Sequence, residues 1–72
     1  MSAVQNTTIP ILLFHGDDDR FVPCEMSREI QKVNPALVTL VEIHRAGHGL
    51  CYMVEPKRYE EATVHFIESL IL

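Results

Sequence analysis

The chain has 72 residues, of which 47% are hydrophobic, and a formal net charge of -4. This length makes one small domain, and a chain of this size buries only about 60% of the surface that its unfolded form exposes. The acidic balance, with a pI near 5.4, argues against a protein that binds a phosphate backbone, because such a partner requires a basic face. We therefore expect a single small domain over residues 1–72 that does not bind nucleic acid.

We expect no targeting signal at the start of the chain. Residues 1–8 are polar and lack a basic region followed by an apolar segment, and the longest apolar run is far shorter than the ~20 residues of a membrane span. We expect a polar tail over residues 1–8, no membrane contact and a cytoplasmic location. Cys24 and Cys51 lack the spacing of a zinc site or a redox pair and are expected to remain free thiols.

The first half of the chain predicts a strand followed by a helix. A branched and aromatic run over residues 9–14 is typical of a strand covered on both faces, with Pro10 at its start because proline cannot donate to a ladder. From Gly16 the chain becomes a polar loop. Pro23 suits the first turn of a helix that stops before Pro35. The apolar stripe of this helix comprises Met26, Ile30 and Val33.

The second half repeats this order. Residues 37–43 are rich in valine, leucine and isoleucine and predict a second strand, and residues 45–54 predict a loop that holds two glycines. Pro56 then opens a second helix. One face of that helix is predicted to carry Tyr59, Ala62, Phe66, Ile67 and Leu70.

A short helix between two strands implies a parallel pair joined by a right-handed crossover. Parallel strands end at the same edge of their sheet, and in open α/β sheets this edge collects ligands and catalytic groups. Asp19 and His48 each follow the predicted end of a strand by a few residues, in loops that contain glycine. We therefore expect an Asp19 carboxylate oxygen within about 3.2 Å of a His48 ring nitrogen, the upper end of hydrogen-bond reach.

These residues resemble a known family. The pattern H-G-x-x-D-x-x-V-P over residues 15–23, followed after a helix and a strand by G-H-G at residues 47–49, is similar to the C-terminal portion of the α/β-hydrolase superfamily, in its esterase-like or peptidase-like members. The resemblance covers residues 9–72. It implies an α/β fold of strand, helix, strand and helix, in which the two parallel strands form the C-terminal end of an α/β-hydrolase sheet.

The resemblance also implies roles for two residues. Asp19 matches the catalytic acid of the family, and His48 matches the general base. In such a site the carboxylate fixes the tautomer of the imidazole and stabilises the imidazolium that forms when the other ring nitrogen accepts the nucleophile's proton. No cofactor or metal is implied.

The nucleophile has no evident position in this chain. No G-x-S-x-G sequence occurs, and the family's oxyanion loop and nucleophile elbow lie upstream of the part that this chain resembles. The three serines are Ser2 in the tail, Ser27 on the first helix and Ser69 near the C-terminus. We expect the chain to be the C-terminal part of a serine hydrolase that acts on esters or related acyl bonds, and to be inactive alone.

Other polar and sulfur-containing side chains have simpler interpretations. Asp17 and Asp18 are interpreted as solvated loop charges, and His15 is expected to order its own loop by hydrogen bonding. Cys24 lies near a helix N-terminus, where a thiolate would be stabilised, so a cysteine nucleophile is conceivable. Residues without assigned chemistry are His44 and His65, and those assigned to the core are Met26, Tyr59 and Phe66.

Two further classes of function stay open. One is an oligomerising or binding module, since the mean hydropathy of +0.09 is high for a chain with so much surface and the strand over residues 9–14 would present an apolar edge. Its partner would be a second copy, in a homo-oligomer, or a missing N-terminal half. The other is a metal-binding loop at residues 17–19, although this run of aspartates lacks a calcium-loop pattern.

Overall fold

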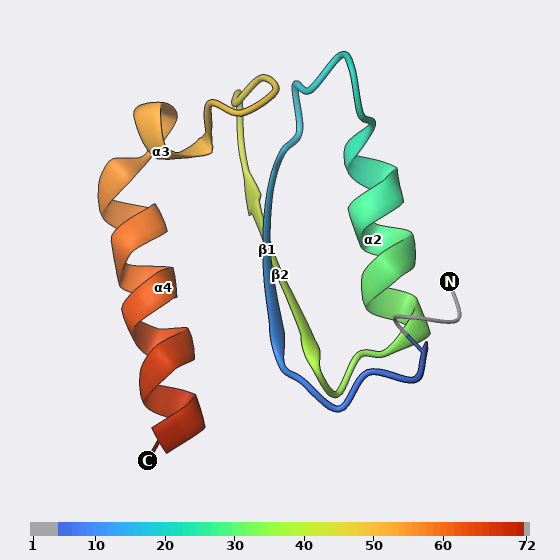
Figure 1. The fold of residues 1–72 in the computed structure, drawn as a ribbon. Helices are drawn as coiled ribbons and strands as arrows, with labels where there is room; N and C mark the ends of the chain where they lie inside the picture. The colour runs from blue at the N-terminus through green and yellow to red at the C-terminus, as the bar shows by residue number, and fades with distance from the viewer. Residues whose placement is uncertain (1–4, 72) are drawn as a thin grey trace.

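The computed structural model describes residues 5–71, and part of the predicted tail over residues 1–8 lies outside that range. Two strands alternate with helices in the predicted order (Figure 1). The elements are β1 (Ile11–Gly16), α2 (Cys24–Val33), β2 (Val38–Ile43), α3 (Cys51–Val54) and α4 (Pro56–Ile71). The short helix α3 corrects one prediction, because it lies in the segment that the sequence predicts to be a loop throughout.

The two strands form a parallel sheet, as expected of the α/β class. Their register runs from Ile11 opposite Val38 to Gly16 opposite Ile43. β1 begins two residues later than predicted, because Pro10 has no N–H and the first bond from this strand is donated by Ile11 N to the carbonyl of Leu37 at 2.8 Å. The sheet therefore consists of two neighbouring parallel strands, and helix α2 is the crossover that connects them along the chain.

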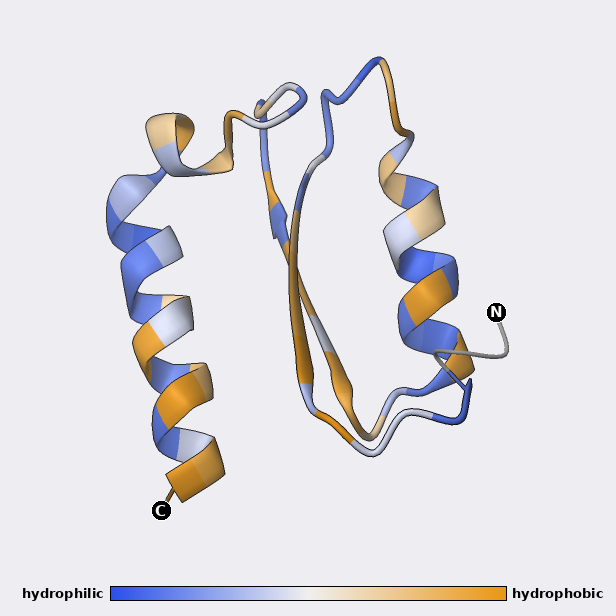
Figure 2. Ribbon diagram, in the orientation of Figure 1, coloured by the Kyte–Doolittle hydropathy of each residue, from blue (hydrophilic) through white to orange (hydrophobic). Residues whose placement is uncertain are grey.

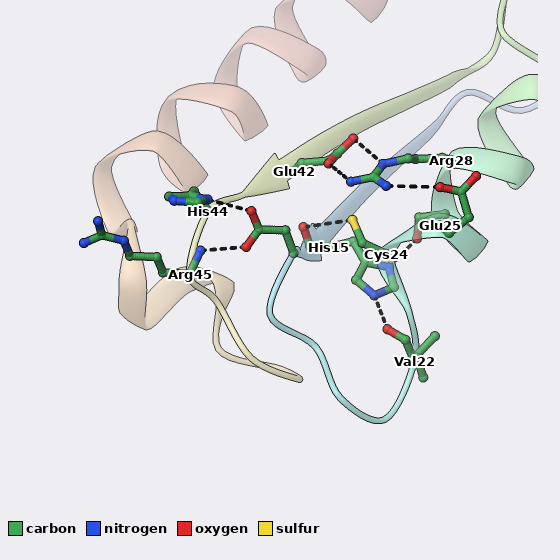
Figure 3. Close-up of polar contacts among 10 residues, drawn as sticks. His15, Val22, Cys24, Glu25, Arg28, Glu42, His44 and Arg45 are labelled. Carbon is green, nitrogen blue, oxygen red and sulfur yellow. Dashed lines mark hydrogen bonds and ion pairs between the residues drawn. The ribbon is translucent and has the colours of Figure 1, made fainter.

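Helices α2 and α4 lie on opposite sides of the strand pair (Figure 1). Since side chains alternate along a strand, each strand contributes to both sides. On one side Arg28 of α2 donates two hydrogen bonds to the carboxylate of Glu42 in β2, at 3.0 and 2.6 Å (Figure 3). On the other side the rings of Phe14 and Tyr59 stack with centroids 4.0 Å apart, which joins β1 to α4.

A small cluster of buried hydrophobic residues lies under the carboxyl ends of the strands. Ile43 and Ala46 are fully buried and Cys51 is 8% exposed; Phe14 and Tyr59 pack against this cluster. The cluster joins the end of β2, the loop after it and α3. It therefore supports the loop that contains His48.

Part of the predicted apolar faces remains exposed. Met26 is 55% exposed, so its assignment to the core is wrong, and Ile67 and Leu70 of α4 are 50% and 51% exposed. Figure 2 shows that hydrophobic residues recur along α4 up to its C-terminal end. The Cα atoms extend 30 × 28 × 13 Å. A sheet of two strands in such a thin slab is too narrow to cover the whole face of a 16-residue helix.

Among residues 5–71 no helix is both long enough and apolar enough to cross a membrane, and the longest, α4, has 16 residues.

Candidate functional site

Two loops meet at the carboxyl ends of the strands. The first loop follows Gly16, and the second follows Ile43. Their backbones touch: a Cβ added to Gly16 would lie 2.0 Å from the carbonyl oxygen of Ala46, and the N–H of Asp18 donates to that oxygen at 3.0 Å. Only glycine permits this approach. The parallel topology and this close contact bring the two sequence motifs together.

Asp19 and His48 form the hydrogen bond that the sequence predicts. Nδ1 of His48 lies 3.0 Å from Oδ2 of Asp19. A carboxylate can only accept, so Nδ1 carries the hydrogen and Nε2 of a neutral ring is left as an acceptor. Nε2 has no hydrogen-bond partner among residues 5–71, and the His48 side chain is 56% exposed. The geometry is that of an acid bound to a base whose second nitrogen is open to a proton donor.

The Asp19 carboxylate is held on several sides. Its side chain is only 5% exposed, and Oδ1 accepts hydrogen bonds from the backbone N–H groups of Phe21 and Val22, both at 2.9 Å. Desolvation acts to raise the pKa of Asp19, but the hydrogen bonds from Val22, His48 and Phe21 outweigh it and lower the pKa to about 2. The group is therefore ionised throughout the range in which a histidine can act as a base.

His15 fixes the first loop from inside, as predicted. Its Nε2 lies 2.7 Å from the carbonyl oxygen of Val22 (Figure 3) and 3.3 Å from Oδ2 of Asp19, and its Nδ1 lies 2.5 Å from Oγ of Ser27. Because a carbonyl only accepts, Nε2 carries the hydrogen and Ser27 donates to Nδ1. Ser27 is 8% exposed. Its hydroxyl therefore joins the first helix to β1.

A pocket of about 450 Å³ opens beside the pair. This volume falls in the range of small-molecule sites. The pocket combines aromatic side chains with the polar groups described above, so it can hold an apolar group next to the imidazole. Its lining includes Phe14, Tyr52, Tyr59, His15, Asp19 and His48.

The structure corrects the interpretation of Asp17 as a solvated loop charge. Asp17 is not simply a solvated charge, because Oδ2 lies 2.6 Å from Nδ1 of His44 and Oδ1 accepts the backbone N–H of Arg45 at 2.8 Å (Figure 3). The hydrogen bond to His44, followed by that to the Arg45 N–H, lowers the pKa of Asp17. His44, to which the sequence assigned no chemistry, is thus the partner of a second carboxylate. The run of three aspartates at residues 17–19 does not indicate which of them pairs with His44.

The two thiols do not have the surroundings of a nucleophile. Cys24 and Cys51 are free and buried. Burial is the largest effect on both and raises the pKa of each thiol, and nearby carboxylates act in the same direction, Glu42 on Cys24 and Asp19 on Cys51. The protonated thiol of Cys24 is therefore favoured over the thiolate that a cysteine nucleophile would require. Within residues 5–71 no cluster of three histidine, cysteine or acidic residues could hold a metal ion, which leaves residues 17–19 without the ligand set of a metal loop.

Neither serine of the described chain is hydrogen-bonded to His48. Ser27 is buried and bonded to His15, and Ser69 donates to the carbonyl oxygen of Phe66 at 2.6 Å in the last helix. Ser2 lies outside the described residues. The Asp19–His48 pair therefore has no serine hydrogen-bonded to its imidazole among residues 5–71.

Comparison with known proteins adds no assignment. No protein-family model and no curated protein matches the chain.

Proposed function

We propose that this chain is the C-terminal part of a serine hydrolase of the α/β-hydrolase superfamily, acting on esters or related acyl bonds. The observation that carries the proposal is the hydrogen bond from Nδ1 of His48 to the ionised carboxylate of Asp19, at the carboxyl end of a parallel sheet. The parallel pair would then be the end of a larger hydrolase sheet. The nucleophile and the oxyanion donors would come from polypeptide outside these 72 residues.

In this proposal each member of the pair has one task. Nε2 of His48 accepts the proton of an incoming serine hydroxyl as its oxygen attacks the acyl carbon, and then returns that proton to the leaving alkoxide or amine. Asp19 holds the tautomer with Nδ1 protonated and stabilises the imidazolium between these two steps. The aromatic side chains of the pocket next to His48 would bind an apolar group of the substrate.

The test compares ester hydrolysis by three proteins. They are the 72-residue chain, the chain extended by the polypeptide encoded immediately upstream, and the extended chain with His48→Ala. We expect hydrolysis of short-chain aryl esters only by the second protein. Absence of acyl hydrolysis by the extended chain, or activity that survives His48→Ala, would contradict the proposal.

A second candidate function, self-assembly, is favoured by the unpaired edge of β1. A second copy of this chain is the occupant that we propose, in a homo-oligomer formed through residues 9–14.

The pairing edge would be that of β1. Ile11 N donates to Leu37 O in the ladder with β2, so by alternation the N–H groups of Leu12 and Phe14 point to the opposite edge. No partner for these two groups lies among residues 5–71. An unpaired apolar edge of this kind is a template for another strand. Two copies of β1 would meet antiparallel across a two-fold axis.

A further inference from the structure

A second acid–histidine contact joins the same two loops. Asp17 and Asp19 are two residues apart in the first loop, and their partners His44 and His48 are four residues apart in the second. The contact at His44 is on the surface, since that side chain is 75% exposed. The other oxygen of Asp17 binds the backbone N–H of Arg45. One carboxylate therefore holds two successive residues of the second loop.

Arg45 adopts a backbone conformation that needs such support. Its φ is 67°, and it is the one residue other than glycine with positive φ among the described residues. The left-handed region is unfavourable for a residue with a Cβ, because the Cβ crowds the following carbonyl oxygen. Strand β2 ends at Ile43, and the turn at Arg45 redirects the chain just after it. Arg45 lies three residues before His48. Asp17 therefore binds the loop at Arg45, the residue whose turn sets the direction of the chain toward His48.

We infer that Asp17 is a positioning residue for His48: by accepting the Arg45 N–H and the His44 Nδ1–H, it fixes the turn that points His48 at Asp19. The inference deepens the proposed function and rests on it for its relevance to catalysis, but the positioning itself is a property of this chain alone. Asp17 does not touch the reacting atoms. It acts through the backbone of the loop and by geometry, since its charge is not needed to accept either hydrogen bond.

The experiment measures the tautomer of the His48 ring by ¹⁵N NMR at about pH 8.5, well above the ordinary histidine pKa of about 6.5. Wild type should show hydrogen on Nδ1, held there by Asp19. Asp17→Ala should lose this preference, and its His48 signals should approach those of free histidine, in which Nε2 carries the hydrogen. Asp17→Asn should keep the wild-type tautomer, because its amide oxygen still accepts the Arg45 N–H.

Asp18→Asn is the matched control, since it removes an adjacent exposed charge and should leave the His48 tautomer unchanged. Far-UV circular dichroism selects a temperature at which every variant is folded, so that a loss of stability alone does not move the readout. If Asp17→Ala unfolds, Arg45→Pro, which removes the donated N–H and excludes positive φ, is compared with Arg45→Gly, which keeps both; only the first should change the tautomer. A wild-type tautomer in a folded Asp17→Ala or Arg45→Pro protein would overturn the inference. Loss of the wild-type His48 tautomer to the same extent in Asp17→Asn and Asp18→Asn would also overturn the inference, because the loss of a negative charge would then be the cause.

The proposed function fails separately from this inference. If the tautomer depends on Asp17 but the extended protein hydrolyses no acyl substrate, the positioning stands and the hydrolase proposal does not.

Discussion

Nδ1 of His48 lies 3.0 Å from Oδ2 of Asp19, although 29 residues separate the two in the chain. The contact follows from topology, because the two strands are parallel and the loops after them therefore lie at the same edge of the sheet. It also follows from Gly16, at which the two loops touch. The imidazole is exposed while the carboxylate is buried, so the base can be reached and the acid is held.

The low pKa of Asp19 predicts a dependence of stability on acid pH. This carboxyl group titrates near 3.8 when unfolded and at about 2 when folded. Its contribution to stability is therefore complete above about pH 4 and is lost as the pH falls through 2. Urea unfolding at pH 5, 4, 3 and 2 should show wild type more stable than Asp19→Asn at pH 5 and the difference shrinking toward pH 2. Asp17 and Glu42, whose pKa values are also lowered, remain in both proteins and cancel. A difference that stays constant from pH 5 to pH 2 would contradict the assignment.

The close approach at Gly16 predicts a severe effect of one methyl group. Gly16→Ala places a Cβ against the Ala46 carbonyl and should lower the free energy of unfolding by about 3 kcal/mol, or prevent folding. Gly47→Ala is the matched control, because its Cβ would lie 3.5 Å from Cδ1 of Leu50 and should change the free energy by less than about 1 kcal/mol. Chemical denaturation followed by circular dichroism measures both. Equal stability of the two variants would show that the loops do not meet as described.

The lack of an adjacent nucleophile predicts that the 72-residue chain does not turn over esters. Its rate on short-chain aryl esters should equal that of His48→Ala, measured at the same protein concentration. A rate that depends on His48 would contradict this prediction. The nucleophile would then have to be sought at Ser27, Cys24 or Cys51, all of which are buried.

The free edge of β1 predicts that assembly can be disrupted at one backbone position. Leu12→Pro removes an N–H that points away from β2, so it should dissociate or aggregate the homo-oligomer. Leu13→Pro should instead unfold the chain, since that N–H faces β2. Glu68→Gln, on the exposed surface of α4, should leave the mass unchanged. Light scattering at micromolar concentration gives the mass, and a stable wild-type monomer would rule out self-assembly.

The sequence predicted those features that depend on periodicity and chain order. Two apolar runs flanking an amphipathic helix were enough for the parallel pair, and the positions of Asp19 and His48 after those runs were enough for their contact. The four residues of α3 are too few to show a period. The exposure of Ile67 and Leu70 depends on how wide a sheet lies beneath α4, and a helical stripe does not contain that information.

Asp17 could not be predicted for a different reason. One of its partners is a backbone N–H at Arg45, which every residue except proline possesses, and the positive φ that presents this group is uncommon for arginine. Likewise, nothing in the spacing of His15 and Ser27 indicates that one would accept a hydrogen bond from the other, because the crossover helix sets that distance. Sequence patterns located the loops, and the side-chain partners within them depended on backbone geometry.

If Asp19 and His48 are the acid and base of a serine hydrolase, its nucleophile lies outside residues 1–72. A fluorophosphonate reacts with an activated serine, so the native protein, taken from its own cells, is treated with this reagent in wild type and in His48→Ala, and mass spectrometry maps the modified residue. We expect labelling of a serine outside residues 1–72 in the polypeptide that contains this chain, and its loss in His48→Ala. An unlabelled native protein, or labelling that is unchanged in His48→Ala, would contradict it.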